Sequence, residues 1–164
     1  MLDLLPDLYD LYSDRLRLLN LNWKHFGDKP IFWGPVQTVS CFEDNSKVAE
    51  LLASPGDGQV LLVDGAASHN RALLGDNLAQ KGIDNGWAGV VINGCMRDAG
   101  TINQMPIGVK ALGTCPIKTD KRGQGEVGIA VEIAGIEIHP GEYLYADLNG
   151  IAVSDQALAI PNLE

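Results

Sequence analysis

Two short apolar runs near the middle of the chain limit the folds that it can adopt. Val60–Val63 and Ala88–Ile92 are each followed by a polar residue and a glycine, and neither run alternates with polar residues. Continuous apolar strands are typical of a parallel sheet that is covered on both faces. Ser46–Ala53 and Asp76–Asn85 have helical spacing, and one of them precedes each run. Because strands and helices alternate, we expect an α/β fold with a parallel or mixed central sheet.

The last third of the chain has a different pattern. From Ile129 onward, apolar residues alternate with other residues at period two, and the alternation continues to Val153. Asn149–Gly150 lies between two such runs, and this dipeptide favours a tight hairpin. We therefore expect antiparallel β-strands to follow the α/β centre. Upstream, Val36–Phe42 is predicted as a further strand.

The first part of the chain is predicted to pack on the rest as an arm. Residues 4–19 have the spacing of a helix, and residues 23–33 are expected to be irregular because Gly27 and Pro30 interrupt them. With 164 residues, of which 46% are hydrophobic, the chain fits a single domain over 1–164 in which 1–33 form this arm.

Charge and composition exclude several classes of protein. Lysine and arginine number 12 and acidic residues number 21, so the net charge is −9 and repels a phosphate backbone. The apolar runs are too short to span a bilayer, and the start lacks the basic region of a secretory signal. Cys41, Cys95 and Cys115 show no CxxC spacing, so neither a disulfide framework nor a zinc site is expected. We predict a cytoplasmic protein that binds neither nucleic acid nor membranes.

Polar, glycine-containing loops follow the two apolar strands, and ligands of open α/β sheets bind at such strand ends. The first loop leads to Gly75–Leu78, which opens a helix whose free N–H groups at Asn77 and Leu78 could bind a carboxylate. The alternative is that Asp76 is only the N-cap of that helix.

The second loop carries Arg97 and Asp98 side by side. An arginine can hold a carboxylate through two parallel hydrogen bonds, and an aspartate is a hard oxygen ligand for a metal. The alternative is an exposed pair that forms only a surface salt bridge. Twenty residues separate Asp76 from Arg97, which places the two halves of the pattern after strands that are expected to be adjacent.

These two segments carry a resemblance to a known family. Gly75–Leu78 together with Gly89–Asp98 resembles the class II pyruvate aldolases that cleave 4-hydroxy-4-methyl-2-oxoglutarate and 4-carboxy-4-hydroxy-2-oxoadipate, and the related regulator of ribonuclease activity A. The resemblance runs from about Gly34 to Ser154 and includes Cys41–Asn45. It implies a swivelling β/β/α domain, usually a homotrimer or a dimer of trimers, with the site near a subunit interface.

The resemblance also implies a role for each site residue. Asp98 would bind a divalent cation, Mg²⁺ or Mn²⁺, and Arg97 would hold substrate oxygens. The backbone of Gly75, Asp76, Asn77 and Leu78 would hold the pyruvyl carboxylate, and Asp76 would hold metal-bound waters. Asp76 and Arg97 are thus the predicted catalytic residues. The regulator branch lacks the aspartate of the Arg-Asp pair, whereas this chain keeps it.

The expected function is a metal-dependent lyase that releases pyruvate from such 2-oxo acids by a retro-aldol reaction and decarboxylates oxaloacetate through the same enolate. The alternative is a non-catalytic regulator that binds and inhibits a ribonuclease, because Cys41–Asn45 is closer to the regulator branch. Three residues stay open. His69 and Arg71 lie in the loop before Gly75, where Arg71 either neutralises a second substrate carboxylate or has only a surface role. Asp147 either forms a turn or faces the site of a neighbouring subunit.

Overall fold

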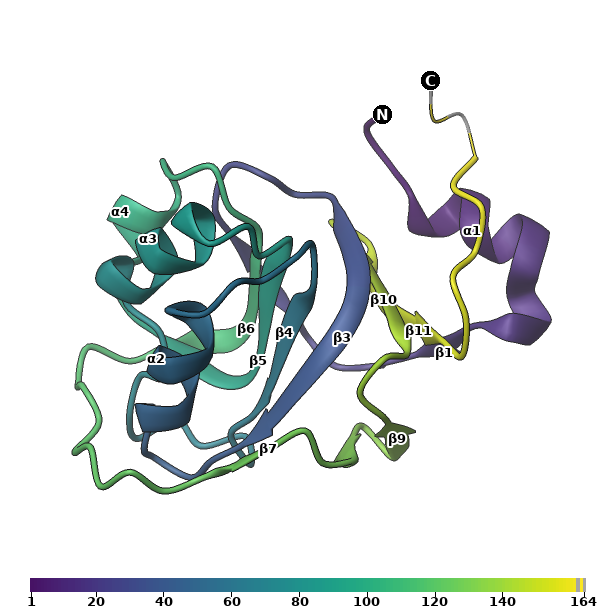
Figure 1. Cartoon of the computed structure of the whole chain (residues 1–164). Coiled ribbons are helices and arrows are strands. Elements are labelled where there is room, and N and C mark those ends of the chain that lie inside the picture. The colour runs from purple at the N-terminus through teal and green to yellow at the C-terminus, as the bar shows by residue number, and fades with distance from the viewer. Residues whose placement is uncertain (162, 164) are drawn as a thin grey trace.

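The computed structural model describes residues 1–161 and 163, and it has a mixed α/β architecture. Figure 1 shows α2, α3 and α4 gathered against one side of the sheet, with α1 on the opposite side beyond the final hairpin. The elements, with a 3₁₀ turn at Ser13–Arg15 after the first helix, are α1 (Leu5–Tyr12), β1 (Arg17–Leu18), β2 (Lys24–Phe26), β3 (Phe32–Ser40), α2 (Ser46–Leu52), β4 (Val60–Asp64), α3 (Asp76–Asp84), β5 (Gly89–Met96), α4 (Ala99–Ile102), β6 (Val109–Thr114), β7 (Glu126–Val127), β8 (Val131–Ile133), β9 (Ile136–Ile138), β10 (Tyr143–Asp147) and β11 (Gly150–Ser154).

Among the described residues, a curled main sheet has the strand order β1-β11-β10-β3-β4-β5-β6-β2, with β7 paired to β3. The strands β3, β4, β5 and β6 are parallel to one another, whereas β10, β11, β1 and β2 join the sheet by antiparallel pairing. The expected fold class, a parallel centre followed by antiparallel strands, is confirmed. The long strand β3 connects the two halves, because Phe32–Pro35 pairs with β10 and Val36–Ser40 pairs with β4.

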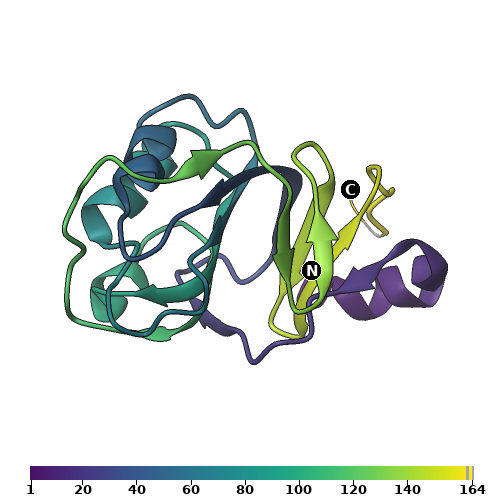
Figure 2. The same ribbon diagram turned by 90° about the horizontal axis from the view of Figure 1, so that it is seen from below.

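Three layers of apolar side chains explain the two sequence patterns. On β4, Leu61 and Val63 pack under the helices, whereas Val60 and Leu62 pack against the C-terminal strands. Both faces of β4 are therefore buried, as its continuous apolar run requires. Figure 2 shows the C-terminal strands between the parallel centre and α1. On β10, Leu144 faces the middle layer and Tyr145 faces α1, which is the origin of the period-two pattern.

The helix predicted over residues 4–19 is shorter in the structure. Leu4 and Leu8 are fully buried against the final hairpin, but α1 ends at Tyr12 rather than Leu19. Residues 17 and 18 pair with β11 instead, so tertiary strand pairing outweighs the helical spacing of the sequence. The oligomeric state stays a prediction.

The segment 23–33 is not wholly irregular. Lys24–Phe26 forms β2, which pairs with β6, and β3 begins at Phe32 rather than at Val36. Strand β5 also runs beyond the expected Ile92, because a register shift after that residue lets Cys95 and Met96 continue the pairing with β6. The extension carries β5 up to the residue before Arg97. No helix in the described part of the chain is long and apolar enough to cross a bilayer.

Candidate active site at the ends of the parallel strands

The segment before α3 lies alongside the end of β5, and this contact brings the two halves of the sequence pattern together. Leu73 N–H donates to the carbonyl oxygen of Cys95 at 2.9 Å, and Arg97 N–H donates to the carbonyl oxygen of Leu74 at 2.8 Å. The N-terminus of α3, at Gly75, therefore lies beside Arg97 and Asp98. Gly75, Asp76, Asn77, Leu78, Arg97 and Asp98 all line one cavity of about 600 Å³.

The start of α3 is open to a ligand. Gly75 occupies the N-cap position with no side-chain cap, and Asp76 is the first helical residue. The alternative in which Asp76 caps the helix is therefore wrong. Within residues 1–161, no hydrogen bond engages the backbone N–H groups of Asn77 and Leu78. Such unpaired N–H groups at a helix N-terminus favour an anion.

Asp98 is held in an unusual backbone conformation. Its φ of 59° and ψ of 38° lie in the left-handed region, which aspartate and asparagine tolerate better than other side chains. One carboxylate oxygen, Oδ2, accepts the N–H of Asp76 at 3.0 Å. Strained backbone of this kind is often concentrated at functional sites. The conformation directs the carboxylate back to the start of α3.

Gly75 leaves the space that Asp98 and Arg97 occupy. A Cβ atom at residue 75 would lie 2.8 Å from Asp98 Oδ2 and 3.3 Å from Arg97 Nε, closer than ordinary van der Waals contact. The φ of Gly75 is −129°, so the glycine is needed for space and not for backbone freedom. The predicted contribution of Gly75 to the site thus has a steric basis.

A divalent cation fits this carboxylate. Mg²⁺ is commonly bound by one or two carboxylates and keeps several waters, so it does not need an enclosing set of side chains. Asp98 is exposed at the cavity, with Asp76 one hydrogen bond away. In the part of the chain that the structure covers, no cluster of three or more His, Cys, Asp or Glu side chains forms a metal cage. An exposed Asp98 beside Asp76 is compatible with a cation that keeps most of its waters, and Mg²⁺ or Mn²⁺ stays a prediction.

A further wall of the cavity is a loop that the sequence analysis did not assign to the site. Lys118, Thr119, Asp120 and Lys121 line the cavity, and Lys81 of α3 joins them. With Arg97, the lining carries four cationic and three acidic side chains, in a protein of net charge −9. This local excess of positive charge favours an anionic ligand. In the sequence, the cluster of lysine and arginine over 118–122 is the pattern that could have indicated this part of the site.

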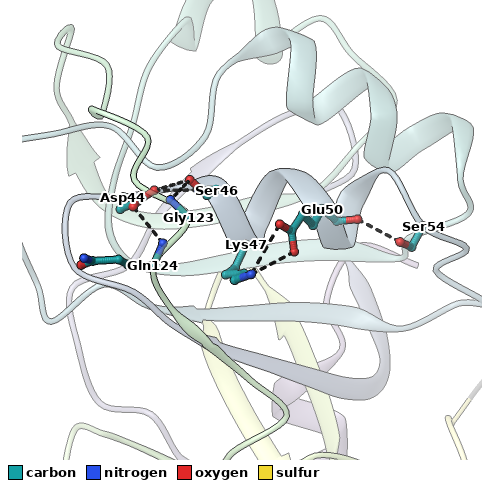
Figure 3. Close-up of polar contacts among 7 residues, drawn as sticks. All are labelled: Asp44, Ser46, Lys47, Glu50, Ser54, Gly123 and Gln124. Atoms are coloured by element: carbon teal, nitrogen blue, oxygen red, sulfur yellow. Dashed lines mark hydrogen bonds and ion pairs between the residues drawn. The ribbon is translucent and has the colours of Figure 1, made fainter.

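The Cys41–Asn45 motif holds that wall in place. Thr119 Oγ1 donates to Asn45 Oδ1 at 2.7 Å, and Asn45 Nδ2 donates to the carbonyl oxygen of Leu73 at 3.3 Å. Figure 3 shows Asp44 at the start of α2, with its carboxylate between Ser46 and the 122–124 loop. The Asp44 carboxylate accepts the N–H and hydroxyl of Ser46 and the backbone N–H groups of Arg122 and Gln124, at 2.6–3.1 Å. This motif therefore has a structural role beside the cavity.

Asp44 makes the loop sensitive to acid. Burial opposes ionisation, but the four hydrogen bonds outweigh it and lower the pKa of Asp44 to about 2. Because the unfolded value is about 3.9, this carboxylate stabilises the fold above that pH, and the contribution is lost as the pH falls through about 2. Between pH 5 and 2, the wild-type urea midpoint should therefore fall more steeply than that of Asp44→Asn. Parallel pH profiles for the two proteins would contradict this assignment.

Three further residues of the sequence analysis lie outside the main cavity. Arg71 lines a smaller neighbouring hollow of about 190 Å³ with Phe42 and Arg122. His69 is exposed, and its Nδ1 lies 3.0 Å from the carbonyl oxygen of Ala67. Asp147 is fully buried at the end of β10 and lines a different pocket. None of the three is among the residues that line the cavity of Asp98.

A curled mixed sheet with helices on one face and an anion-favouring cavity at its parallel strand ends defines an α/β protein of the swivelling type. Residues 5–153 match the family model described as "RraA-like: Aldolase/RraA". The chain therefore belongs to the RraA-like family.

Individual relatives cover nearly the whole chain. A Shewanella oneidensis protein named "Putative 4-hydroxy-4-methyl-2-oxoglutarate aldolase" is 54% identical over 158 residues, 96% of each chain. The structure titled as the RNA-processing inhibitor RraA from Thermus thermophilis is 40% identical with a TM-score of 0.92, covering 99% of this chain and 98% of that one. A Geobacillus kaustophilus structure, titled as an S-adenosylmethionine:2-dimethylmenaquinone methyltransferase, is 46% identical with a TM-score of 0.90, covering 94% and 96%.

Proposed function

We propose that this protein is a divalent-metal-dependent lyase that cleaves 2-oxo acids of the 4-hydroxy-4-methyl-2-oxoglutarate type to pyruvate by a retro-aldol reaction. We further propose that it decarboxylates oxaloacetate, because both reactions leave the enolate of pyruvate. The observation that carries the proposal is the convergence of a free helix N-terminus, Arg97 and Asp98 on one cavity. The name of the Shewanella oneidensis relative supports the same class of reaction.

The cavity suits a substrate with more than one carboxylate. The N–H groups of Asn77 and Leu78 would hold the carboxylate next to the 2-oxo group, as helix N-termini hold anions. Lys118 and Lys121, which line the same cavity, would receive the second carboxylate of the substrate. Substrates of this class carry carboxylates at both ends, so the charge pattern of the lining matches them.

Arg97 would stabilise the negative charge that develops on the 2-oxo oxygen when the carbon–carbon bond breaks. Its backbone is fixed by the hydrogen bond to Leu74, and its guanidinium Nε lies beside Gly75. A positive charge that is already in position needs no rearrangement in the transition state. A divalent cation at Asp98 would supply further positive charge to the same oxygens when bound.

Asp76 would orient the water that takes the proton from the 4-hydroxyl group and then returns a proton to the methylene carbon of the enolate, which gives pyruvate. It lines the cavity as the first residue of α3, and its backbone N–H is already bound by Asp98. A carboxylate in this position can accept a hydrogen bond from the water and align it with the hydroxyl.

Replacing Asp76 with asparagine is therefore expected to slow turnover by about 10²–10⁴-fold, which is typical of losing an acid–base group. Metal affinity should change little, because the backbone N–H of residue 76 still donates to Asp98. Calorimetric Mn²⁺ titration and pyruvate release, measured on the same preparation, separate the two effects. Loss of metal binding in Asp76→Asn would show that residue 76 binds the cation directly.

The decisive experiment for the proposed function begins with chelator-stripped protein. Oxaloacetate and 4-hydroxy-4-methyl-2-oxoglutarate are supplied in turn, with and without Mg²⁺ or Mn²⁺, and pyruvate is measured with lactate dehydrogenase. We expect pyruvate release that depends on the added metal. If neither 2-oxo acid yields metal-dependent pyruvate, the lyase assignment is wrong.

A second candidate function is regulation of an RNA-processing enzyme through direct binding. It is favoured by the Thermus thermophilis structure, whose title names an RNA-processing inhibitor, and by the net charge of −9. An acidic surface is suited to contact the basic regions of a ribonuclease rather than the RNA. Inhibition of a purified ribonuclease that survives Asp98→Asn would support this candidate, because that change removes the metal-binding charge and leaves the outer surface unaltered.

A further inference from the structure

A second pocket lies on the face of the sheet that is turned away from α2, α3 and α4. Val109 and Ala111 of β6 pack in the layer under these helices, so Lys110 between them points to the opposite face. There it lines a pocket of about 300 Å³ between β2 and the turn that joins β10 to β11. A pocket of this volume is at the lower end of the range for small-molecule sites. None of its lining residues belongs to the cavity of Asp98.

Lys110 is a buried residue whose ammonium group forms no ion pair among the described residues. Its side chain is 2% exposed, and no hydrogen bond or ion pair engages its Nζ atom in residues 1–161. Burial lowers the pKa of Lys110 to about 8, although the charge of Asp147 opposes the shift. Buried charges in proteins are normally paired, because an unpaired one loses its hydration without compensation. An ammonium group that is left unpaired at a pocket therefore indicates a missing partner.

The carboxylate of Asp147 also lines the pocket, but both of its oxygens already accept hydrogen bonds from other groups. Its Oδ2 accepts the backbone N–H groups of Leu4 and Leu5, both at 2.8 Å, and the side-chain amide of Asn149 at 3.1 Å. Its Oδ1 accepts the backbone N–H of Asn149 at 2.6 Å. These donors offset the charge of Asp147 and hold it away from Lys110, with no ion pair within 4 Å between them.

His25 adds no second positive charge. It lies directly opposite Lys110 in the β2–β6 pair, and its Nε2 is 2.9 Å from the carbonyl oxygen of Gly27. A carbonyl only accepts, so the ring proton is on Nε2, and the buried Nδ1 carries a lone pair. Burial and the neighbouring Lys110 both lower the pKa of His25, which keeps the ring neutral. The positive charge of the pocket thus comes from Lys110.

Part of the pocket lining is apolar, although the polar side chains of Asn22 and Asn149 also line it. Leu21 and Leu148 line it and are 36% and 66% exposed. Trp23 also lines it, but its indole N–H is already committed to the carbonyl oxygen of Leu19 at 2.9 Å, so the ring presents mainly carbon atoms to a ligand. A ligand that satisfies both parts of the pocket needs one negative end and one hydrocarbon end.

We propose that this pocket binds a small organic carboxylate, whose charged end meets Lys110 Nζ and whose short hydrocarbon chain packs against Trp23 and Leu148. The site is separate from the proposed catalytic cavity, so it adds a second ligand to the protein. A bare oxyanion such as phosphate would pair with Lys110 but would make no contact with the apolar part of the lining, Leu21, Trp23 and Leu148.

Butyrate is a suitable probe because it has the right charge and length and is not a 2-oxo acid. The chain has three tryptophans, so the indole N–H signals in a ¹⁵N correlation spectrum are few enough to assign. Butyrate should shift the Trp23 signal saturably and leave that of Trp87 unchanged. Butyramide, which is neutral and has the same shape, should bind about tenfold more weakly or worse, the usual effect of losing a charge-assisted hydrogen bond.

Lys110→Met removes the charge and keeps the apolar length of the side chain, so it should reduce butyrate affinity about tenfold or more. Lys24→Met is the matched control. Lys24 is an exposed lysine on β2 that does not line the pocket, and its loss should change the affinity by less than about twofold. Equal shifts with butyrate and butyramide, or equal losses in the two variants, would overturn the proposal.

A measurement on the unaltered protein covers the case in which Lys110→Met does not fold. The ¹³Cε signal of Lys110 reports its protonation, and a bound carboxylate should raise the pKa of this residue from about 8 toward the ordinary value of lysine. A Lys110 pKa that does not respond to saturating butyrate would refute the site. Saturation by inorganic phosphate in the absence of any response to butyrate would show that the proposed ligand class is wrong.

Discussion

Replacing Asp98 with asparagine is expected to lower metal affinity and pyruvate release together, each on the order of 100-fold or more. The amide oxygen of asparagine can still accept the N–H of Asp76, and asparagine tolerates the left-handed backbone at residue 98. The substitution therefore removes the negative charge and little else. Mn²⁺ titration calorimetry and pyruvate release measure the two effects, and the thermal midpoint should stay within about 2 °C of wild type.

The choice of variants matters at this residue. Asp98→Ala would also remove the cap on the Asp76 N–H and would strain an alanine at a φ of 59°, so a loss of activity in that variant has two explanations. Arg97→Lys is the informative companion, because it keeps the charge but loses the planar fork. It should reduce turnover while leaving Mn²⁺ affinity near wild type. Normal metal binding and turnover in Asp98→Asn would place the cation elsewhere.

Replacing Asp147 with alanine is expected to destabilise the fold by roughly 2–6 kcal/mol, because the buried N–H groups of Leu4 and Leu5 each lose their acceptor at about 1–3 kcal/mol apiece. These groups begin α1, so the helix should separate from the final hairpin before the rest of the sheet unfolds. Urea unfolding gives the loss in free energy, and hydrogen exchange shows whether residues 5–12 lose protection first.

Asp3→Ala is the matched control for this prediction. The Asp3 carboxylate is exposed and contacts the same side chain, Asn149, at 2.9 Å, but it caps no buried N–H group. Its removal should change stability by no more than about 0.5 kcal/mol. Similar losses in the two variants would mean that net charge, rather than the cap on α1, determines the stability.

The central fold and one side of the candidate site could be predicted because they depend on local sequence. Val60–Val63 has no alternation, so its burial on both faces follows from the residues alone. Gly75–Leu78 and Arg97–Asp98 follow strands directly, and adjacent parallel strands bring their ends together whatever the details of the loops. The role of Asp98 as the acceptor for Asp76 needed the structure, because it depends on a left-handed residue.

The remaining parts depend on contacts between residues distant in sequence. Lys24–Phe26 is a strand because it pairs with the edge of the sheet at β6. Strand β6 itself contains the buried Lys110, which a pattern of apolar residues would not predict. The wall at Lys118–Lys121 is held by hydrogen bonds that Thr119 donates to Asn45 and that Arg122 donates to Asp44, more than 70 residues away in the sequence. The periodicity of the sequence does not indicate contacts between residues so far apart in the chain.

The pairing of the two ends of the chain has a consequence for its synthesis. β1 pairs with β11, and Asp147 accepts the first N–H groups of α1, so both elements depend on residues 143–154 for their backbone partners. A chain emerges from the ribosome N-terminus first. The apolar face of α1 therefore stays unburied while the strands of the parallel centre are synthesised and fold. The β10–β11 hairpin closes both the sheet and the arm, so neither can be completed before this hairpin has left the exit tunnel.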